Sequence, residues 1–251
     1  MRKKLLSSKK ASELLEGSFF LMKNKQIKLT SADSTGFEAR HVSQYFLQRK
    51  YKGEPVYARF HPKMSIICDC KTHLILSVVT GRGPFPDAPS FKNLLRKIPK
   101  SISIDKLIAD AGYDSEKNHE LAREKYKIRS FFPPLIGRHT KKLPSGKYRR
   151  PMKKLFKFKE NIKYGQRWQV ETIFSMIKRR LTTSARARSY NSQSRELSLI
   201  ALTYNIMVVC AWFLLDLFYR AGRSPIDAAL KRSWSGAPSR QPINTVSSKV
   251  L

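Results

Sequence analysis

Three acidic residues, Asp33, Asp110 and Glu171, stand in contexts that could bring carboxylates into one catalytic site. Asp33 lies in ADSTG and Asp110 in ADAGYDS, each where an apolar stretch meets a turn. Converging carboxylates repel one another and raise one another's pKa unless a cation neutralises them. Hard oxygen ligands of this kind suit Mg²⁺ or Mn²⁺, and two such ions can hold the oxygens of an in-line phosphoryl displacement.

The third carboxylate belongs to YGQRWQVETIFSMIKRR, in which apolar residues recur at helical spacing. Tyr164, Arg167, Glu171 and Lys178 project within roughly 60° of one another on such a helix, beside its apolar face. This segment alone favours a solvated helix edge with Arg167 and Glu171 as an ordinary ion pair. Taken singly, Asp33 and Asp110 fit turn or cap aspartates equally well.

The elements that must position these residues alternate between strands and helices. The predicted strands are 27–32, 64–68, 73–80, 105–110 and 127–132, and the predicted helices are 88–97, 115–126, 164–180 and 197–215. Asp87 is the expected N-cap of the first helix. This order predicts an α/β fold with a mixed sheet. Open α/β sheets bind ligands beyond the carboxyl ends of their strands, so Asp33 and Asp110 could converge on one crevice.

The composition points to a polyanionic partner. Fifty Lys and Arg residues against eighteen Asp and Glu give a net charge of +32, which favours nucleic acid, with an anionic membrane surface as the second choice. Residues 133–163 contain eleven basic residues and one acidic residue, and we expect a cationic loop inserted before the helix that carries Glu171. The basic residues expected to contact DNA there are Lys141, Lys142, Arg149 and Arg150.

The remaining features bear on the compartment. Three cysteines without a CxxC pair fit a reducing compartment and argue against a zinc site, and the N-terminus lacks the apolar region of a secretory signal. The uncharged stretch 197–215 is long enough to span a bilayer. Because Tyr204 and Asn205 lie in its middle, a buried helix is favoured over a membrane segment. We expect a cytoplasmic protein with no stable membrane association.

Three stretches together resemble the insertion-sequence transposases of the DDE superfamily. Tyr164, Arg167, Glu171 and Lys178 match the family's Y-(2)-R-(3)-E-(6)-K signature in all residues and gaps. SADSTGFEARHVSQYF resembles the family's first catalytic block and IADAGYDSEKNHELAR its second. The similarity covers about residues 27–212 and is nearest to the insertion-sequence families numbered four and five.

The resemblance implies a ribonuclease H-like fold in which Asp33, Asp110 and Glu171 bind two Mg²⁺ or Mn²⁺ ions. It also implies that Tyr164, Arg167 and Lys178 hold phosphates of the transposon end. The expected partners are transposon and target DNA, with a homodimer in the DNA complex, in a prokaryotic nucleoid. Trp168, next to Arg167, could stack on a displaced base or fill the core, and the core is favoured.

The expected organisation is a short N-terminal segment (1–26), a catalytic domain (27–220) and a basic tail (221–251). Only 32 residues precede Asp33, and they show no helix-turn-helix, so a truncated or inactive form is one expectation. The alternative function is a non-enzymatic basic nucleic-acid-binding protein. Charge alone allows it, but such a protein has no need for three carboxylates in these positions.

Overall fold

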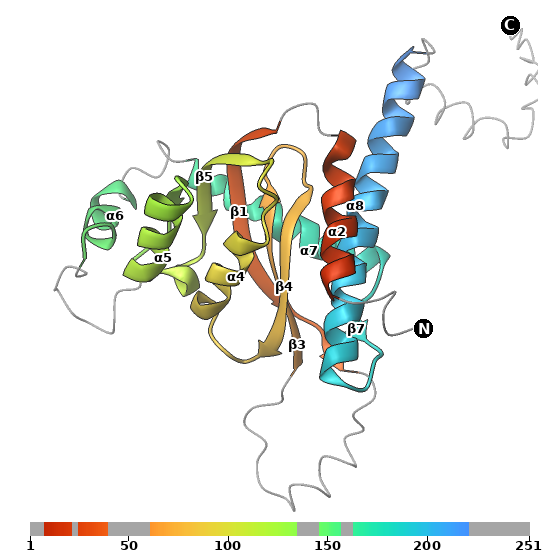
Figure 1. Cartoon of the computed structure of the whole chain (residues 1–251), viewed down its shortest axis with the longest axis horizontal. Helices are drawn as coiled ribbons and strands as arrows, with labels where there is room; N and C mark the ends of the chain where they lie inside the picture. The colour runs from red at the N-terminus through yellow and green to blue at the C-terminus, as the bar shows by residue number, and fades with distance from the viewer. Residues whose placement is uncertain (1–7, 22–24, 40–60, 135–145, 157–162, 221–251) are drawn as a thin grey trace, which may run out of the picture. The chain divides into compact units, whose positions relative to one another are not determined.

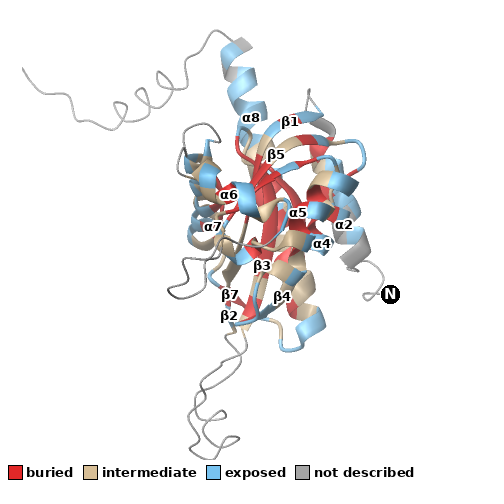
Figure 2. Cartoon of the chain, turned by 90° about the vertical axis from the view of Figure 1, so that its left-hand side faces the viewer, coloured by how far each residue is buried: buried red, intermediate tan, exposed pale blue. Residues whose placement is uncertain are grey.

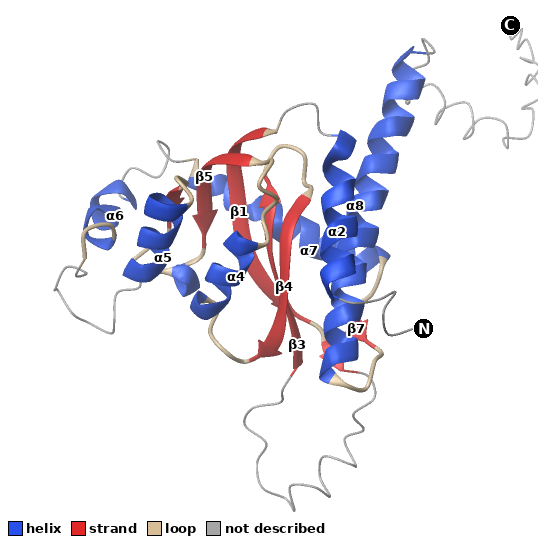
Figure 3. Cartoon of the chain, in the orientation of Figure 1, coloured by secondary structure: helices blue, strands red, loops and turns tan. Residues whose placement is uncertain are grey.

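β-Branched and apolar residues build a five-stranded sheet at the centre of the computed structural model, which describes residues 8–21, 25–39, 61–134, 146–156 and 163–220. The strand order is β4-β3-β1-β5-β6 (Figures 1 and 3). The strands are β1 (Gln26–Gly36), β3 (His61–Asp69), β4 (Ile75–Gly83), β5 (Ser103–Ala109) and β6 (Arg129–Phe131). β1, β3 and β4 pair antiparallel, while β1, β5 and β6 pair parallel. The predicted α/β fold with a mixed sheet is confirmed.

The predicted hairpin around Asp69–Thr72 is confirmed as the β3–β4 connection. The carboxylate of Asp69 accepts hydrogen bonds from the backbone N–H groups of Lys71 and Thr72 and from the Thr72 hydroxyl. An aspartate that bonds to the following backbone in this way stabilises a tight turn. The local sequence therefore determines this connection.

Helices cover both faces of the sheet (Figures 1 and 2). They are α2 (Ser8–Gly17), α4 (Phe91–Arg96), α5 (Glu116–Glu120), α6 (Arg149–Leu155), α7 (Trp168–Arg180) and α8 (Tyr190–Arg220). α4 and α5 lie on one face and α7 on the other (Figure 2). Val170, Ile173 and Ile177 of α7 are fully buried, as their helical spacing predicts. A second, two-stranded parallel sheet joins β2 (Glu38–Ala39) to β7 (Ser184–Ala185).

Two predicted helices begin at the expected residues but open as 3-10 turns. The helix predicted from Tyr164 begins as a 3-10 turn, Tyr164–Arg167, and α7 proper starts only at Trp168. The helix predicted from Ala88 also begins as a 3-10 turn, Ala88–Ser90, before α4. The side chain of Asp87 caps neither, because it bonds to side chains from β1 and β3 instead. Contacts with residues distant in the sequence therefore replace the side-chain cap that the local pattern predicts for Asp87.

The strand predicted to end at Asp33 continues to Gly36. β5 pairs with β1 only as far as Ala32 opposite Ala109, but the antiparallel partner β3 goes on to Lys63 opposite Gly36. Asp33 therefore lies inside β1, at the point where its parallel neighbour ends.

The predicted apolar helix is the middle of α8. Its first half packs in the unit that runs to Val209, and Leu197, Ala201 and Tyr204 are buried there. Asn205 is fully buried and forms hydrogen bonds of 2.9 Å with both the N–H and the C=O of Ile75 in β4. The favoured buried helix is confirmed for this half. Beyond Val209 the apolar side chains of α8 are exposed, and α8 is long and apolar enough over Tyr190–Leu217 to cross a bilayer (Figure 2).

Candidate active site

The sheet register brings the two predicted aspartates side by side. Ala32 and Ala109 are the last paired residues of the parallel strands β1 and β5, so Asp33 and Asp110 occupy the next position on each. Asp110 then begins a 3-10 turn, and its carboxylate accepts a hydrogen bond of 2.7 Å from the N–H of Ala111. Asp33 accepts a similar bond of 2.8 Å from the N–H of Ser34. Both carboxylates are thus oriented by the backbone that follows them.

Arg167 links the third carboxylate to this pair. Its guanidinium donates to Oδ2 of Asp33 at 3.2 Å and to Oε1 of Glu171 at 2.5 Å. The ordinary ion pair that the spacing of Arg167 and Glu171 suggested is present, but it is one half of a bridge between α7 and the sheet. Glu171 is 54% exposed and Asp33 only 20%. The Arg167 backbone is held as well, because its carbonyl accepts from the Ser31 hydroxyl.

The electrostatics agree with this convergence. Burial raises the pKa of Asp33 to about 6, and the carboxylates of Asp110 and Asp87 add to the rise, while the Ser34 N–H and Arg167 oppose it. Burial also raises the pKa of the Tyr164 phenol to about 12, and Asp33, Asp110 and Glu171 add to that rise. Tyr164 therefore lies within electrostatic range of the whole acidic group. Its hydroxyl donates to the carbonyl of Ala109 at 3.3 Å.

The family comparison bears directly on this site. A family model described as the transposase DDE domain matches residues 24–206, well over half of the chain. The chain belongs to the DDE transposase family. A search of the curated proteins gave no match.

Among solved structures, this DDE domain is similar to a piggyBac transposase, whose cryo-EM structure is a synaptic complex with hairpin DNA. The TM-score is 0.46 at 11% sequence identity. The match covers 85% of this chain and 55% of that chain, so the chain spans about half the length of the piggyBac protein.

The donor chemistry of the acidic group suits a hard divalent cation, since Asp33, Asp110 and Glu171 offer only carboxylate oxygens. Their arrangement is not a closed ligand set: within the described ranges, no three acidic, histidine or cysteine side chains form a group that could hold a metal ion. The positive charge between Asp33 and Glu171 comes instead from the guanidinium of Arg167, which lies against both carboxylates.

Two residues of this segment, Lys178 and Trp168, lie away from the acidic group or from the core of the DDE domain. Lys178 is two turns beyond Glu171, about 10 Å along the helix axis, and its ammonium lies 5.7 Å from the ring centre of Phe37. Trp168 was expected in the core, but it is 53% exposed, so that prediction was wrong. Trp168 opens the first turn of α7, and the buried face of that turn is formed by Gln169 and Val170.

A fourth carboxylate, which sequence reasoning treated only as a helix cap, borders the site. Asp87 accepts hydrogen bonds from the hydroxyl of Ser34 at 2.5 Å and from the ammonium of Lys63 at 2.7 Å. A Cβ atom added to Gly112 would lie 3.7 Å from its other oxygen. Asp87 thus connects the residue after Asp33 with the turn after Asp110. No local pattern could reveal this, because the contacts join four separate segments.

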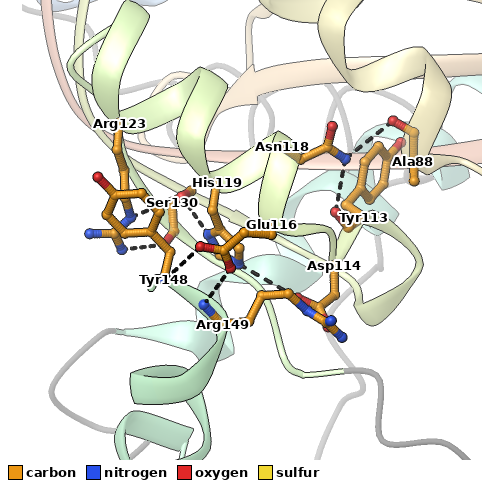
Figure 4. A network of polar contacts seen from close by, with 10 residues as sticks. All are labelled: Ala88, Tyr113, Asp114, Glu116, Asn118, His119, Arg123, Ser130, Tyr148 and Arg149. Carbon is orange, nitrogen blue, oxygen red and sulfur yellow. Dashed lines mark hydrogen bonds and ion pairs between the residues drawn. The ribbon is translucent and has the colours of Figure 1, made fainter. Parts of the chain in front are cut away.

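The basic insertion contains a helix, where only a loop was expected. α6 lies beside α5, and a polar network joins them (Figure 4). Arg149, predicted to contact DNA, forms an ion pair of 2.7 Å with Asp114, whose side chain is fully buried. Arg150 is exposed, and its predicted DNA contact stays a prediction, whereas Lys141 and Lys142 lie outside the described residues.

Proposed function

We propose that this chain catalyses divalent-metal-dependent DNA strand cleavage and strand transfer for an insertion sequence, with Asp33, Asp110 and Glu171 as the metal-binding residues. The observation that carries the proposal is the bridge from Glu171 through Arg167 to Asp33, which is the register neighbour of Asp110. Family membership supports the reaction type, and the match of Tyr164, Arg167, Glu171 and Lys178 to the YREK signature supports a place near the insertion-sequence families numbered four and five.

Each group of the proposed site has a role that fits its chemistry. Two Mg²⁺ or Mn²⁺ ions, when bound, would stabilise the charge on the attacking and leaving oxygens of a phosphodiester. Arg167 can give a bidentate contact to a phosphate, and Tyr164 can donate through its hydroxyl. Lys178, farther along α7, would hold a phosphate farther along the strand. A rigid helix and sheet edge fix these groups relative to the carboxylates, and positioning supplies much of the catalysis in phosphoryl transfer.

The partners follow from the same proposal. The net charge of +32 supports transposon and target DNA as ligands, and a homodimer would bring two transposon ends together. Such a protein would act on the nucleoid in a prokaryotic cytoplasm. Lys141, Lys142 and Arg150 are the proposed backbone contacts of the basic insertion.

The test is a paired thermal melt and cleavage assay of wild type and Asp110→Asn, with and without Mg²⁺ or Mn²⁺. Metal should raise the melting temperature of the wild type and do so less in the variant, because ligand binding to the native state stabilises it. DNA binding should survive in Asp110→Asn while cleavage is lost, since Lys and Arg provide the affinity. Undiminished cleavage by Asp110→Asn would refute the triad. A wild type that binds DNA but shows neither a metal-dependent melt nor cleavage would favour the non-enzymatic binding protein.

A further inference from the structure

The helix of the basic insertion is fastened to the catalytic domain at its N-terminal end (Figure 4). The carboxylate of Glu116 accepts hydrogen bonds from the backbone N–H groups of Tyr148 and Arg149, at 2.9 and 3.1 Å. These are donors that the start of α6 cannot satisfy within the helix. Gly146 makes the approach possible, because its φ is +111° and a Cβ there would lie 2.1 Å from the Glu116 carboxylate. With the buried Arg149–Asp114 pair, these contacts hold α6 at a defined place.

The body of α6 packs on the sheet beneath it. Met152 is 2% exposed and joins Ile108 of β5 and Phe131 of β6 in a small apolar cluster. Leu155 and Phe156, at the end of the helix, are partly buried against the same cluster. The described part of the insertion is therefore a packed element of the domain.

Phe156 connects this element to the candidate active site. Its ring meets the ring of Tyr164 edge to face, with centroids 4.9 Å apart and planes at 82°, the geometry that aromatic pairs prefer. Tyr164 lies in a 3-10 turn rather than on α7, so the helix does not fix its ring. The 3.3 Å hydrogen bond from its hydroxyl to Ala109 is long for an O–H donor and would restrain the ring weakly. Tyr164 packs, like Phe156, against the cluster of Ile108, Phe131 and Met152, and the edge-to-face contact with Phe156 adds a directional restraint on its ring.

We propose that Phe156 is a positioning residue: through it, the basic insertion holds the Tyr164 ring beside Asp110 and Arg167. The proposal rests on the proposed function, in which Tyr164 binds a phosphate next to the cleaved bond. The insertion then has two roles in the reaction: it provides a cationic surface for DNA, and it positions the Tyr164 side chain of the site.

The test compares single-turnover cleavage at saturating DNA in Phe156→Ala, Phe156→Tyr and the matched control Leu155→Ala. We expect Phe156→Ala to slow cleavage about tenfold, the rate equivalent of one aromatic contact, while DNA affinity stays within about twofold. Phe156→Tyr keeps the ring and should restore most of the rate. Leu155→Ala removes packing from the same cluster but keeps the Phe156 ring against Tyr164, so it should lower the melting temperature but leave the rate nearly unchanged. If Leu155→Ala slowed cleavage as much as Phe156→Ala, Phe156 would contribute only general packing, and the proposal would be overturned.

A double-mutant cycle separates this proposal from the proposed function. If Phe156 acts through Tyr164, then Phe156→Ala should add nothing to the loss already caused by Tyr164→Ala. Additive losses would overturn the positioning role while leaving a role for Tyr164. No loss in Tyr164→Ala would overturn both the phosphate contact and the positioning role of Phe156.

A spectroscopic measurement makes the proposal testable without catalysis. In protein with ¹³C-labelled tyrosine, the ring signals of Tyr164 are assigned by their absence in Tyr164→Phe. They should shift in Phe156→Ala, because the neighbouring ring is removed, and stay in place in Leu155→Ala. Unchanged Tyr164 signals in Phe156→Ala would mean that the two rings are not in contact.

Discussion

At the scale of single residues, Asp33 combines burial with neighbouring carboxylates, and this makes its ionisation costly. Its pKa is raised from 3.8 to about 6, so the folded protein binds the proton more tightly than the unfolded chain. The stability that this proton contributes is fully present below pH 3.8 and is lost as the pH rises through about 6. The Asp33 carboxylate is thus ionised at neutral pH at the expense of stability.

Asp33→Asn should therefore stabilise the metal-free protein at pH 8 by up to about 3 kcal/mol, the equivalent of the pKa shift. The gain should shrink toward zero near pH 4, where the wild-type carboxylate is protonated in the folded state. Urea unfolding at both pH values in the presence of a chelator measures this. Asp105→Asn, at an exposed carboxylate paired with Arg129, is the control and should not stabilise the protein. A gain of equal size at both pH values would show that burial of charge is not the cause.

Arg167 illustrates why a conservative change can be severe. Its planar guanidinium reaches Asp33 and Glu171 at the same time, which a single ammonium cannot do in the same geometry. We expect Arg167→Lys to impair cleavage strongly while nonspecific DNA affinity changes little, because the charge is kept. Cleavage and salt-matched binding assays on the same preparation check this. Full activity would make Arg167 a surface partner of Glu171 only.

At the scale of elements, the ion pair of Arg149 with the buried Asp114 is one of the contacts that hold α6. Arg149→Ala would leave the fully buried carboxylate of Asp114 without its counter-charge, beside His119 at 3.6 Å. Breaking a buried pair from one side costs about 3–5 kcal/mol, so we expect a loss near the lower end, because Arg149 is partly exposed. Thermal and urea unfolding measure it, and Arg150→Ala on the exposed neighbouring position should change stability by less than about 0.5 kcal/mol. Similar losses in the two variants would contradict the structural role of Arg149.

The elements also show where local patterns succeed. The helical spacing of Val170, Ile173 and Ile177 and the turn chemistry of Asp69 act within a few residues of each other, and both predictions were confirmed. The predicted end of β1 was wrong, because a strand's length depends on its partner. The helix predicted from Tyr164 opens as a 3-10 turn, whose backbone is anchored by the Ser31 hydroxyl.

At the scale of the whole molecule, the excess positive charge should act through a limited surface. Replacing Lys141, Lys142 and Arg150 by Gln should weaken binding to all DNA sequences alike and reduce the slope of log affinity against log salt by about 3, since each phosphate contact contributes roughly 0.9. The control removes the same charge from the exposed residues Lys92, Arg96 and Lys100 of the α4 region. A slope reduced equally by both sets would mean that DNA binds without a preferred face.

The sequence by itself determined the family, the mixed α/β sheet and the residues with catalytic chemistry. These depend on side-chain type, spacing and periodicity, which are properties of short segments. Only the tertiary structure decided which of these residues meet. The register of β1 and β5 places Asp33 beside Asp110, Arg167 joins them to Glu171, and Lys178 lies apart although it shares the same motif. Phe156 and Tyr164 are brought together by packing between segments, and packing depends on the shape of the whole domain rather than on any local pattern.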